Sequence, residues 1–283
     1  MTAAALLAEA ASVLAAAGVP SPQWDAERLL LHVLGGDRAR LVADPARPVP
    51  AEAEERFRGL VARRAAREPL QHVVGTQAFW RHEFVVTSDV LVPRPETELL
   101  VETALEVLRG VERPIVVDVG TGSGCIALSI AAERPDAVVY GTDISRPALE
   151  VAFQNRKRQN LEERGALLEG HLLAPLAALA GTVDLIVSNP PYVDPADRDS
   201  LQPEVRDHEP ALALFPPGDV LSVYRDLAPA AAAMLRPGGA LAVEISPFVE
   251  EAVRRLFLEA GFARLEVRAD LAGRARVVLG RFG

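Results

Sequence analysis

The first quarter of the chain carries apolar residues at helical spacing. A run dense in alanine and leucine, 3–17, ends at Gly18, and Ser21 with Pro22 opens a second helix that stops before Gly35. Two further helices are expected, a short one at 38–42 and a strongly charged one at 51–67. The pattern predicts an all-helical domain over residues 1–72. It has no catalytic spacing, so we interpret it as a substrate-docking module, with a stabilising cap as the alternative.

From residue 73 the hydrophobic pattern changes from helical to alternating. The segments 73–75, 79–80 and 84–86 are apolar and are separated by polar residues. This arrangement predicts a β-hairpin, which forms a linker over residues 73–92 between two domains.

Residues 93–283 alternate short apolar, β-branched runs with helical stretches. The expected strands are 115–119, 138–143, 166–169, 183–188, 240–245, 264–268 and 276–279. One helix is expected before the first strand, at 96–109, and four more between the strands, at 125–132, 147–160, 219–235 and 247–260. Such alternation is typical of α/β proteins, and a hairpin turn at 270–273 makes the last strand antiparallel. We therefore predict an α/β fold: a seven-stranded, doubly wound, Rossmann-like sheet with a small N-terminal helical domain.

The first strand of this sheet is followed by a glycine-rich turn, which opens a helix. Glycines at 120, 122 and 124 allow the backbone to approach a ligand closely. The spacing differs from the dinucleotide fingerprint, and a glycine turn alone is weak evidence. The turn contains no lysine or arginine to meet phosphates, which argues against P-loop chemistry and favours a sulfonium cofactor such as S-adenosylmethionine.

The second strand ends in Asp143, about twenty residues past the glycine turn. A carboxylate there can accept hydrogen bonds from both hydroxyls of a ribose. Its alternative role would be to cap the next helix. Ser145, with Pro147 just inside the helix, already supplies the cap, so we assign Asp143 to the ribose.

The fourth strand ends in Asn189, Pro190, Pro191 and Tyr192. Prolines have no backbone N–H, so they stop the ladder and leave a stiff rim at the edge where α/β sheets bind ligands. A plain strand-end turn is the alternative interpretation. The Asn189 side-chain oxygen and the Pro190 carbonyl could accept both hydrogens of a planar NH2 group, on which Tyr192 would stack. Such acceptors would aim the lone pair of the substrate nitrogen at a methyl carbon and stabilise the positive charge that develops on that nitrogen. We assign no general base.

Composition and net charge limit the binding partners and the cellular compartment that we expect for this protein. The 283 residues carry a net charge of -9, which gives no global basic field for nucleic acid. The single cysteine, Cys125, permits no internal disulfide and suits the cytoplasm. The five histidines have no metal-ligand spacing, so no metal is expected. We expect no membrane span, and no signal peptide because the apolar N-terminus lacks a basic leader and carries Glu9.

These motifs together resemble class I S-adenosylmethionine-dependent methyltransferases that act on NH2 groups. The resemblance rests on 118–124, Asp143 and 188–192, in this order and spacing. Three further features narrow the resemblance to the HemK/PrmC family of release-factor glutamine methyltransferases. They are the 79–80 segment, the segment 91–98 with its proline-arginine-proline-glutamate run from position 93, and the helical N-terminal region. By its residues alone, the 93–98 segment is the start of a capped helix or a contact with a cofactor.

The resemblance implies a substrate, a cofactor and a set of site residues. The substrate would be the glutamine of the Gly-Gly-Gln motif in class 1 peptide chain release factors, and the products N5-methylglutamine and S-adenosylhomocysteine. The glutamine amide would be held by Asn189, Pro190, Pro191 and Tyr192, of which Asn189, Pro190 and Tyr192 are the catalytic residues. The cofactor would be held by Gly120, Thr121, Gly122, Ser123, Gly124, Asp143, Leu172 and Asn189. The helical domain would help to grip the release factor.

Two positions depart from the pattern of relatives. His171 and Leu172 stand where many relatives have an acid followed by an aromatic residue, at the expected adenine contact. In the late turn Ala275 replaces a frequent acid, for which we expect only a local effect. Two alternative functions are an adenine-N6 methyltransferase acting on DNA or RNA, and a non-catalytic cofactor-binding module. The net negative charge of the chain argues against a methyltransferase that acts on nucleic acid. The presence of Asn189 and Asp143 argues against a non-catalytic module.

Overall fold

The structure is a computed structural model that describes residues 1–283, apart from the side chain of Arg40. The chain forms two compact units. Unit 1 consists of Met1–Thr76 and Leu201–His208, and unit 2 of Gln77–Ser200 and Glu209–Gly283. The segment Leu201–His208 therefore belongs to unit 1, whereas the sequence pattern had grouped it with residues 93–283.

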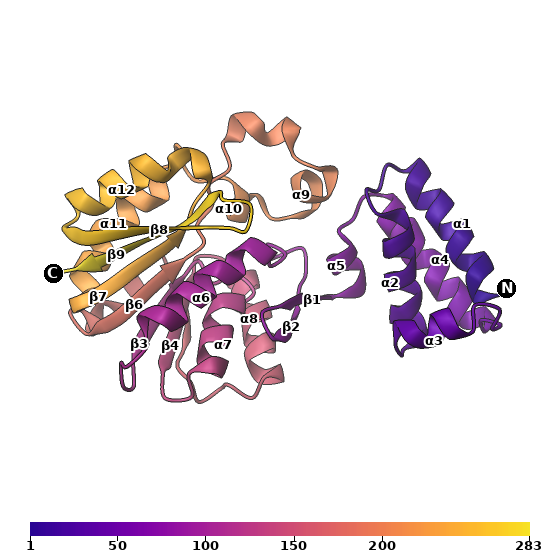
Figure 1. The fold of residues 1–283 in the computed structure, drawn as a ribbon, viewed down its shortest axis with the longest axis horizontal. Helices are drawn as coiled ribbons and strands as arrows, with labels where there is room; N and C mark the ends of the chain where they lie inside the picture. The colour runs from indigo at the N-terminus through magenta and orange to yellow at the C-terminus, as the bar shows by residue number, and fades with distance from the viewer. The chain divides into compact units, whose positions relative to one another are not determined.

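Unit 1 is helical (Figure 1). Its helices are α1 (Ala3–Ala16), α2 (Pro22–Leu34), α3 (Arg38–Ala43), α4 (Ala51–Ala65), α5 (Leu70–Val74) and α9 (Pro203–His208). Their apolar faces meet in one core, which includes Leu6, Leu14, Leu29, Leu30 and Phe57. The strand expected at 73–75 was wrong, because Pro69 precedes a helical turn that Gly75 ends in the left-handed conformation, with φ 79°. A short apolar run does not by itself distinguish a helix from a strand.

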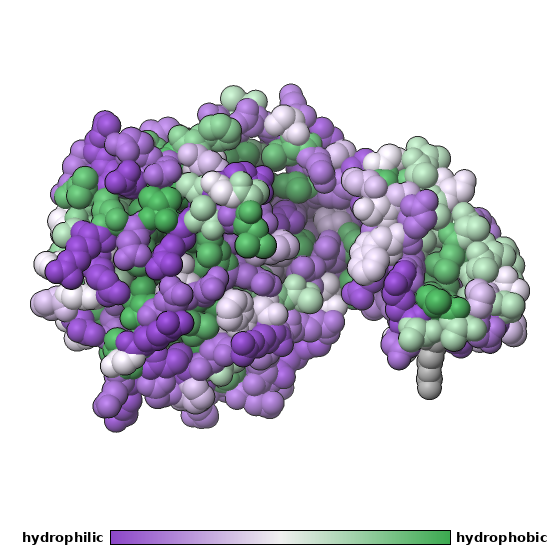
Figure 2. All heavy atoms as spheres, in the orientation of Figure 1, coloured by the Kyte–Doolittle hydropathy of each residue, from purple (hydrophilic) through white to green (hydrophobic). Residues whose placement is uncertain are grey.

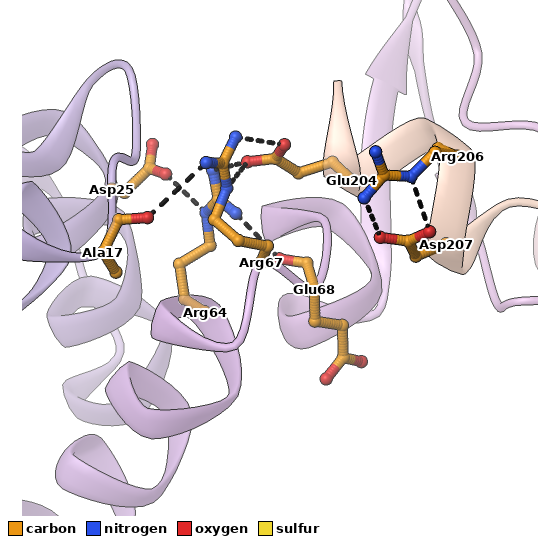
Figure 3. Close-up of polar contacts among 8 residues, drawn as sticks. All are labelled: Ala17, Asp25, Arg64, Arg67, Glu68, Glu204, Arg206 and Asp207. Atoms are coloured by element: carbon orange, nitrogen blue, oxygen red, sulfur yellow. Dashed lines mark hydrogen bonds and ion pairs between the residues drawn. The ribbon is translucent and has the colours of Figure 1, made fainter. Parts of the chain in front are cut away.

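A buried network of ion pairs lies inside unit 1 (Figure 3). Arg64 Nε donates to Asp25 Oδ2 over 2.7 Å, and Arg64 Nη2 donates to Glu204 Oε1 over 2.8 Å. Arg67 Nη2 donates to Glu204 Oε2 over 2.6 Å. The Arg67 backbone has a φ of 66°, which is uncommon for a residue other than glycine. Glu204 therefore ties the segment Leu201–His208 to α4 and to the turn that follows it.

Unit 2 contains a large sheet whose strand order is β5-β4-β3-β6-β7-β9-β8. Its strands are β3 (Ile115–Val119), β4 (Val138–Asp143), β5 (Leu167–Glu169), β6 (Val183–Ser188), β7 (Leu235–Glu244), β8 (Phe262–Ala269) and β9 (Ala275–Phe282). Strand β9 runs antiparallel to both β7 and β8, while the neighbouring pairs from β5 to β7 are parallel. The predicted seven-stranded, doubly wound sheet with an antiparallel last strand is confirmed. A separate two-stranded sheet pairs β1 (Thr76–Phe79) with β2 (His82–Val85).

Helices cover both faces of the large sheet (Figure 1). On one face lie α6 (Glu98–Val107), α7 (Cys125–Glu133) and α8 (Arg146–Arg158), and on the other lie α11 (Ser222–Met234) and α12 (Glu250–Glu259). Successive strand residues alternate between two cores: Val116 and Leu185 pack with α6 and α7, whereas Val117 and Ile186 pack with α11 and α12. This period-2 alternation buries both faces of the sheet. Charged and polar residues cover much of the face shown in Figure 2, with hydrophobic residues between them.

Short helical segments complete the connections of unit 2. They are η1 (Pro95–Thr97), η2 (Ala174–Leu179), η3 (Pro195–Ser200), α10 (Ala211–Leu214) and η4 (Pro247–Val249). The helix expected at 96–109 thus starts as the 3-10 turn η1 and continues as α6. Thr97, in η1, is buried and faces the functional site described next.

Candidate active site

The register of the sheet aligns four residues at its carboxyl edge. Val119 pairs with Thr142 on one side and with Ser188 on the other, and Ser188 pairs with Val243. The residue after each of these continues the row, which is formed by Asp143, Gly120, Asn189 and Glu244. Three predicted site motifs (Asp143, the glycine turn and the Asn189 rim) and one unpredicted carboxylate therefore stand side by side.

A cavity of about 360 Å³ lies at this edge, entirely within unit 2. Its lining includes these predicted site residues: Gly120, Thr121, Gly122, Ser123, Asp143, Leu172, Asn189, Pro190 and Pro191. Gly124 and Tyr192 are not among the residues that line it. The cavity is also bordered by Pro93, Arg94 and Thr97 of the proline-arginine-proline-glutamate segment and by Pro210, Leu212 and Ala213.

The glycine turn is held against the end of β4. The backbone N–H groups of Gly120 and Thr121 both donate to the Thr142 carbonyl, over 2.8 and 3.0 Å. Gly120 and Gly122 have φ values of 71° and 55°, and a Cβ on either would meet no atom within 4 Å. Glycine is therefore needed at both positions for backbone conformation, and the space above them is open to a ligand.

Gly124, unlike Gly120 and Gly122, is closely surrounded by side chains. Its φ is 80°, and a Cβ there would lie 3.0 Å from Leu128 Cδ1 and 3.3 Å from the Cβ of Ala152. The third glycine therefore permits close packing of α7 against α8, and its predicted part in holding the cofactor stays a prediction.

Asp143 is anchored by backbone groups on both sides. Its Oδ2 accepts from Gly122 N over 2.8 Å, and its Oδ1 accepts from Ser145 N over 2.9 Å. Ser145 caps α8 by accepting from Ala148 N, as its sequence position predicted. Burial raises the pKa of Asp143 although these backbone hydrogen bonds act to lower it. Asp143 is thus not free of partners, but each carboxylate oxygen has another lone pair for a ligand hydroxyl.

Leu172 lines the cavity in an unusual backbone conformation, with a φ of 48°. His171 before it is exposed and also lines the cavity. These two residues thus occupy the wall at which an adenine contact was expected. The part that Leu172 plays in binding remains a prediction.

The Asn189 rim begins where β6 is fixed to its neighbour. Ser188 Oγ donates to the Val119 carbonyl over 2.7 Å, which fixes the end of β6 against β3. The Asn189 side-chain nitrogen donates to Thr97 Oγ1 over 3.2 Å. That bond engages the NH2 half of the amide, so the oxygen is the half available to a ligand in the cavity.

Tyr192 is held by Glu244 and by the hydrophobic core of unit 2. Its hydroxyl donates to Glu244 Oε1 over 3.0 Å, and its ring packs into the core formed with α11 and α12. Burial, with Glu244 beside it, raises the pKa of Tyr192 well above its ordinary value. The predicted stacking of Tyr192 on a substrate amide remains a prediction.

Comparisons with known proteins decide the family. Residues 5–75 match the model of the PrmC N-terminal domain, and residues 95–207 match that of the methyltransferase small domain. The chain is 46% identical to the release factor glutamine methyltransferase of Cereibacter sphaeroides over 283 residues, covering 99% of both chains. It is 45% identical to that of Deinococcus radiodurans over 276 residues, covering 98% of this chain and 97% of the relative.

The chain belongs to the release factor glutamine methyltransferase family. Its fold is also seen in more distant enzymes: a Thermus thermophilus 16S rRNA N2 G1207 methyltransferase, solved with S-adenosylmethionine and guanosine, superposes with a TM-score of 0.54. That protein is 22% identical, and the match covers 74% of this chain and 50% of the solved one. S-adenosylmethionine is the methyl donor of the release factor glutamine methyltransferase family.

Sequence reasoning missed two residues of this family member's site. Glu244 ends β7 with no exposed surface, and Thr97 in η1 is 2% exposed. Burial raises the pKa of Glu244 to about 7, against the lowering effects of the nearby Thr97 hydroxyl and of the hydrogen bond from Tyr192. An acid at the end of the apolar run 240–245 was a usable signal, because the same pattern had identified Asp143. The segment that contains Thr97 had been interpreted as a helix start or a cofactor contact, but nothing in its sequence singled out Thr97.

A second carboxylate near the cavity is paired with an arginine. Both Glu209 oxygens accept from Arg94 Nη2 at 2.7 Å, and the Glu209 side chain is almost fully buried. Arg94 lines the cavity, so this pair fixes part of its wall.

Among the residues that the structure describes, no group of three or more histidine, cysteine or acidic side chains is arranged to hold a metal ion. In the same part of the chain no helix has the length and apolar character needed to cross a membrane.

Proposed function

We propose that this protein transfers a methyl group from S-adenosylmethionine to the side-chain amide nitrogen of the glutamine in the Gly-Gly-Gln motif of class 1 peptide chain release factors. The observation that carries the proposal is the Asn189 amide, whose nitrogen is bound to Thr97 and whose oxygen is left for the cavity. Relatives from Cereibacter sphaeroides and Deinococcus radiodurans, aligned along nearly their whole length, bear the corresponding name.

The residues around the cavity suit S-adenosylmethionine. Open space above Gly120 and Gly122 admits a ligand close to the backbone, and Asp143 offers carboxylate oxygens to ribose hydroxyls. We assign Thr121, Ser123 and Leu172 to the same binding wall. When bound, S-adenosylmethionine supplies a methyl carbon activated by the positive sulfur, and S-adenosylhomocysteine is the product. The mechanism needs no metal.

The Asn189 rim would make the amide nitrogen nucleophilic. An amide nitrogen is a poor nucleophile because its lone pair is delocalised into the carbonyl. Acceptors on both N–H bonds, Asn189 Oδ1 and the Pro190 carbonyl, would favour a pyramidal nitrogen and stabilise its developing positive charge. Pro191 would keep the rim rigid and Tyr192 would pack against the flat amide. The nitrogen would gain the methyl carbon and lose one proton to solvent, so no general base is assigned.

Unit 1, which includes the helical domain predicted at residues 1–72, would serve as the module that grips the release factor. The hairpin at 73–92 would act as the linker, and residues 93–283 would form the methyltransferase domain. Because translation termination takes place in the cytoplasm, we place the protein there, with no membrane or nucleic acid among its partners.

Labelled S-adenosylmethionine tests the substrate directly. Incubation with a class 1 release factor should label the glutamine of its Gly-Gly-Gln motif, and a release factor in which that glutamine is alanine should stay unlabelled. Adenine-containing DNA and RNA are included because the same acceptor rim suits an aromatic NH2 group. Label that entered only nucleic acid would refute the proposed substrate.

Asn189→Ala tests the mechanism. We expect turnover to fall at least a hundredfold, because an acceptor aimed at the reacting nitrogen is lost. Calorimetric affinity for S-adenosylmethionine should stay largely intact, because Asn189 is only one of the residues assigned to the cofactor and Asp143 and the glycine turn are untouched. Full turnover by this variant would eliminate the acceptor-rim mechanism.

A further inference from the structure

Asn155 is a polar side chain on the buried face of α8, among apolar neighbours. It has no exposed surface, and it is not among the residues that line the cavity. Burying an amide group is costly unless its hydrogen-bonding groups find partners inside the protein. The partners of Asn155 therefore indicate what this residue does.

The Asn155 amide makes three hydrogen bonds, all to backbone groups. Its Oδ1 accepts from Val85 N over 2.6 Å, and its Nδ2 donates to the Val85 carbonyl over 3.0 Å. The same Nδ2 donates to the Ser123 carbonyl over 2.9 Å. A backbone N–H can only donate and a carbonyl can only accept, so these partners permit one orientation of the amide. Asn155 thus pairs with Val85 as a neighbouring strand would, and gives its second hydrogen to the glycine turn.

These hydrogen bonds join two segments that both contribute to the cavity. Ser123 belongs to the glycine turn and lines the cavity. Val85 ends β2, and residues 89–91, a few positions further along the chain, line the cavity as well. That stretch is fixed on α8 by a buried apolar cluster, which consists of Val86, Val90, Ala148 and Val151. One side chain of α8 therefore holds both segments.

The glycine turn also packs directly on α8, one helical turn before Asn155. A Cβ on Gly124 would lie 3.3 Å from the Cβ of Ala152, which shares a helix face with Asn155 three residues later. Nearer its start, α8 contributes Ser145 and Ala148 to the lining of the cavity. The helix is thus a common support for the cavity wall, and Asn155 is its polar contact with the glycine turn and with the end of β2.

We propose that Asn155 is a positioning residue for S-adenosylmethionine, which holds the glycine turn and the 89–91 stretch at the spacing that the cofactor needs. The proposal rests on the proposed function, because that function requires this cofactor. Asn155 acts through Ser123 and through the chain that follows Val85. Since the Asn189 rim makes none of these contacts, the effect of Asn155 should fall on cofactor affinity and not on kcat.

Asn155→Leu in the full-length protein tests the proposal by calorimetry. Leucine has a similar volume but leaves the buried backbone groups of Val85 and Ser123 without their partner. The dissociation constant of S-adenosylmethionine should rise about 5–50-fold. Gln154→Leu is the matched control, because Gln154 is an exposed amide next to Asn155 on α8 and does not line the cavity. Its dissociation constant should stay within about twofold of the parent value.

Kinetics separate positioning from a purely structural role. In Asn155→Leu the KM for S-adenosylmethionine should rise with the dissociation constant, while kcat at saturating cofactor and the KM for release factor stay within about twofold. A lower melting temperature with parent-like cofactor affinity would show a structural role alone and overturn the proposal. A kcat that fell about tenfold at saturating cofactor would also overturn it, because the effect would then reach the chemical step.

Amide hydrogen exchange in the parent protein is a second measurement, which decides the matter should Asn155→Leu fail to fold. If the held spacing favours the cofactor, the cofactor must favour the held spacing to the same extent. Saturation with S-adenosylmethionine should therefore slow local exchange of the Val85 N–H about fivefold or more, although Val85 does not line the cavity. The Gly273 N–H, bonded to the Asp270 carbonyl in the turn between β8 and β9, should not change. Unchanged exchange at Val85 would overturn the proposal.

The same assays distinguish this proposal from the proposed function. Equal cofactor affinities of the parent and Asn155→Leu would refute the role of Asn155 and leave methyl transfer to the release factor standing. A parent protein that bound S-adenosylmethionine more tightly than Asn155→Leu, but left the release factor unlabelled, would support the role of Asn155 and refute the proposed substrate. A parent protein that bound no S-adenosylmethionine would overturn both.

Discussion

Glu204→Ala should destabilise unit 1 strongly, although the residue lies far along the chain from the helices that it joins. The substitution removes both the pair with Arg64 and the pair with Arg67. The Arg64 side chain is only 6% exposed, so it would be left in the interior with Asp25 as its one carboxylate partner. Removing one member of a buried ion pair costs about 3–5 kcal/mol, and we expect about 2–4 kcal/mol here because Asp25 remains.

Tryptophan fluorescence can follow unit 1 in the whole protein. The chain has two tryptophans, Trp24 in α2 of unit 1 and Trp80 in unit 2. In a Trp80→Phe background Trp24 reports unit 1 alone, and it is 53% exposed already, so its lifetime and quenching are recorded as well as its intensity. With a slope of about 1 kcal/mol per M of urea, the midpoint of the Glu204→Ala variant should fall by roughly 2 M or more.

Glu9→Ala is the matched control. Glu9 shares Arg58 with Glu54 in the same unit, as Glu204 shares Arg64 with Asp25, but that cluster is exposed. Solvent screens such pairs, so its urea midpoint should stay within experimental error. Equal midpoints for Glu204→Ala and the parent would refute the argument that burial makes this network important.

The pH dependence gives a second check on Glu204. Burial acts to raise its pKa, but hydrogen bonds from Arg67 and Arg64 outweigh that effect and hold the pKa below its ordinary value. A carboxyl group whose folded pKa is depressed stabilises the protein fully above the unfolded pKa of about 4.3, and loses that contribution as the pH falls through the folded pKa. The gap in urea midpoint between parent and Glu204→Ala should therefore close in acid.

Three further predictions concern unit 2. Asp143→Ala should raise the calorimetric dissociation constant of S-adenosylmethionine at least tenfold, because the ribose loses its acceptor and the Gly122 N–H loses its partner; unchanged affinity would count against the assignment. Gly124→Ala should lower the free energy of unfolding by about 2–4 kcal/mol, from a Cβ 3.0 Å from Leu128 Cδ1 and a left-handed backbone; a normal melting temperature would show that the helices can shift apart. Burial raises the folded pKa values of Asp118 and Glu244 to about 7, so the contribution of these two acids to the stability of unit 2 is fully present below their unfolded pKa and is lost as the pH rises through 7. Glu244→Gln should flatten that dependence in thermal melts, and an identical pH profile would contradict it.

The local pattern of the sequence predicted most elements correctly. Strands β3, β4 and β6 were placed within one residue of their observed bounds, because buried parallel strands are short β-branched runs between punctuating residues. The error at 73–75 arose where a run of three residues fits either kind of structure. The glycine turn and Asp143 were found from their spacing, which the geometry of a strand, a turn and a helix fixes locally.

The sequence by itself thus determined the fold class, the glycine turn, Asp143 and the Asn189 rim, because each is encoded within a few consecutive residues. Only the tertiary structure decided that Glu244 and Thr97 adjoin Asn189, since strand register and the path of η1 bring together residues that lie 55 and 92 positions away from it. It also assigned Glu204 to the helical unit, 140 positions from Arg64. The physical reason is common to these cases: a single-residue signal carries no record of its distant partner, whose place is set by the packing of the whole chain.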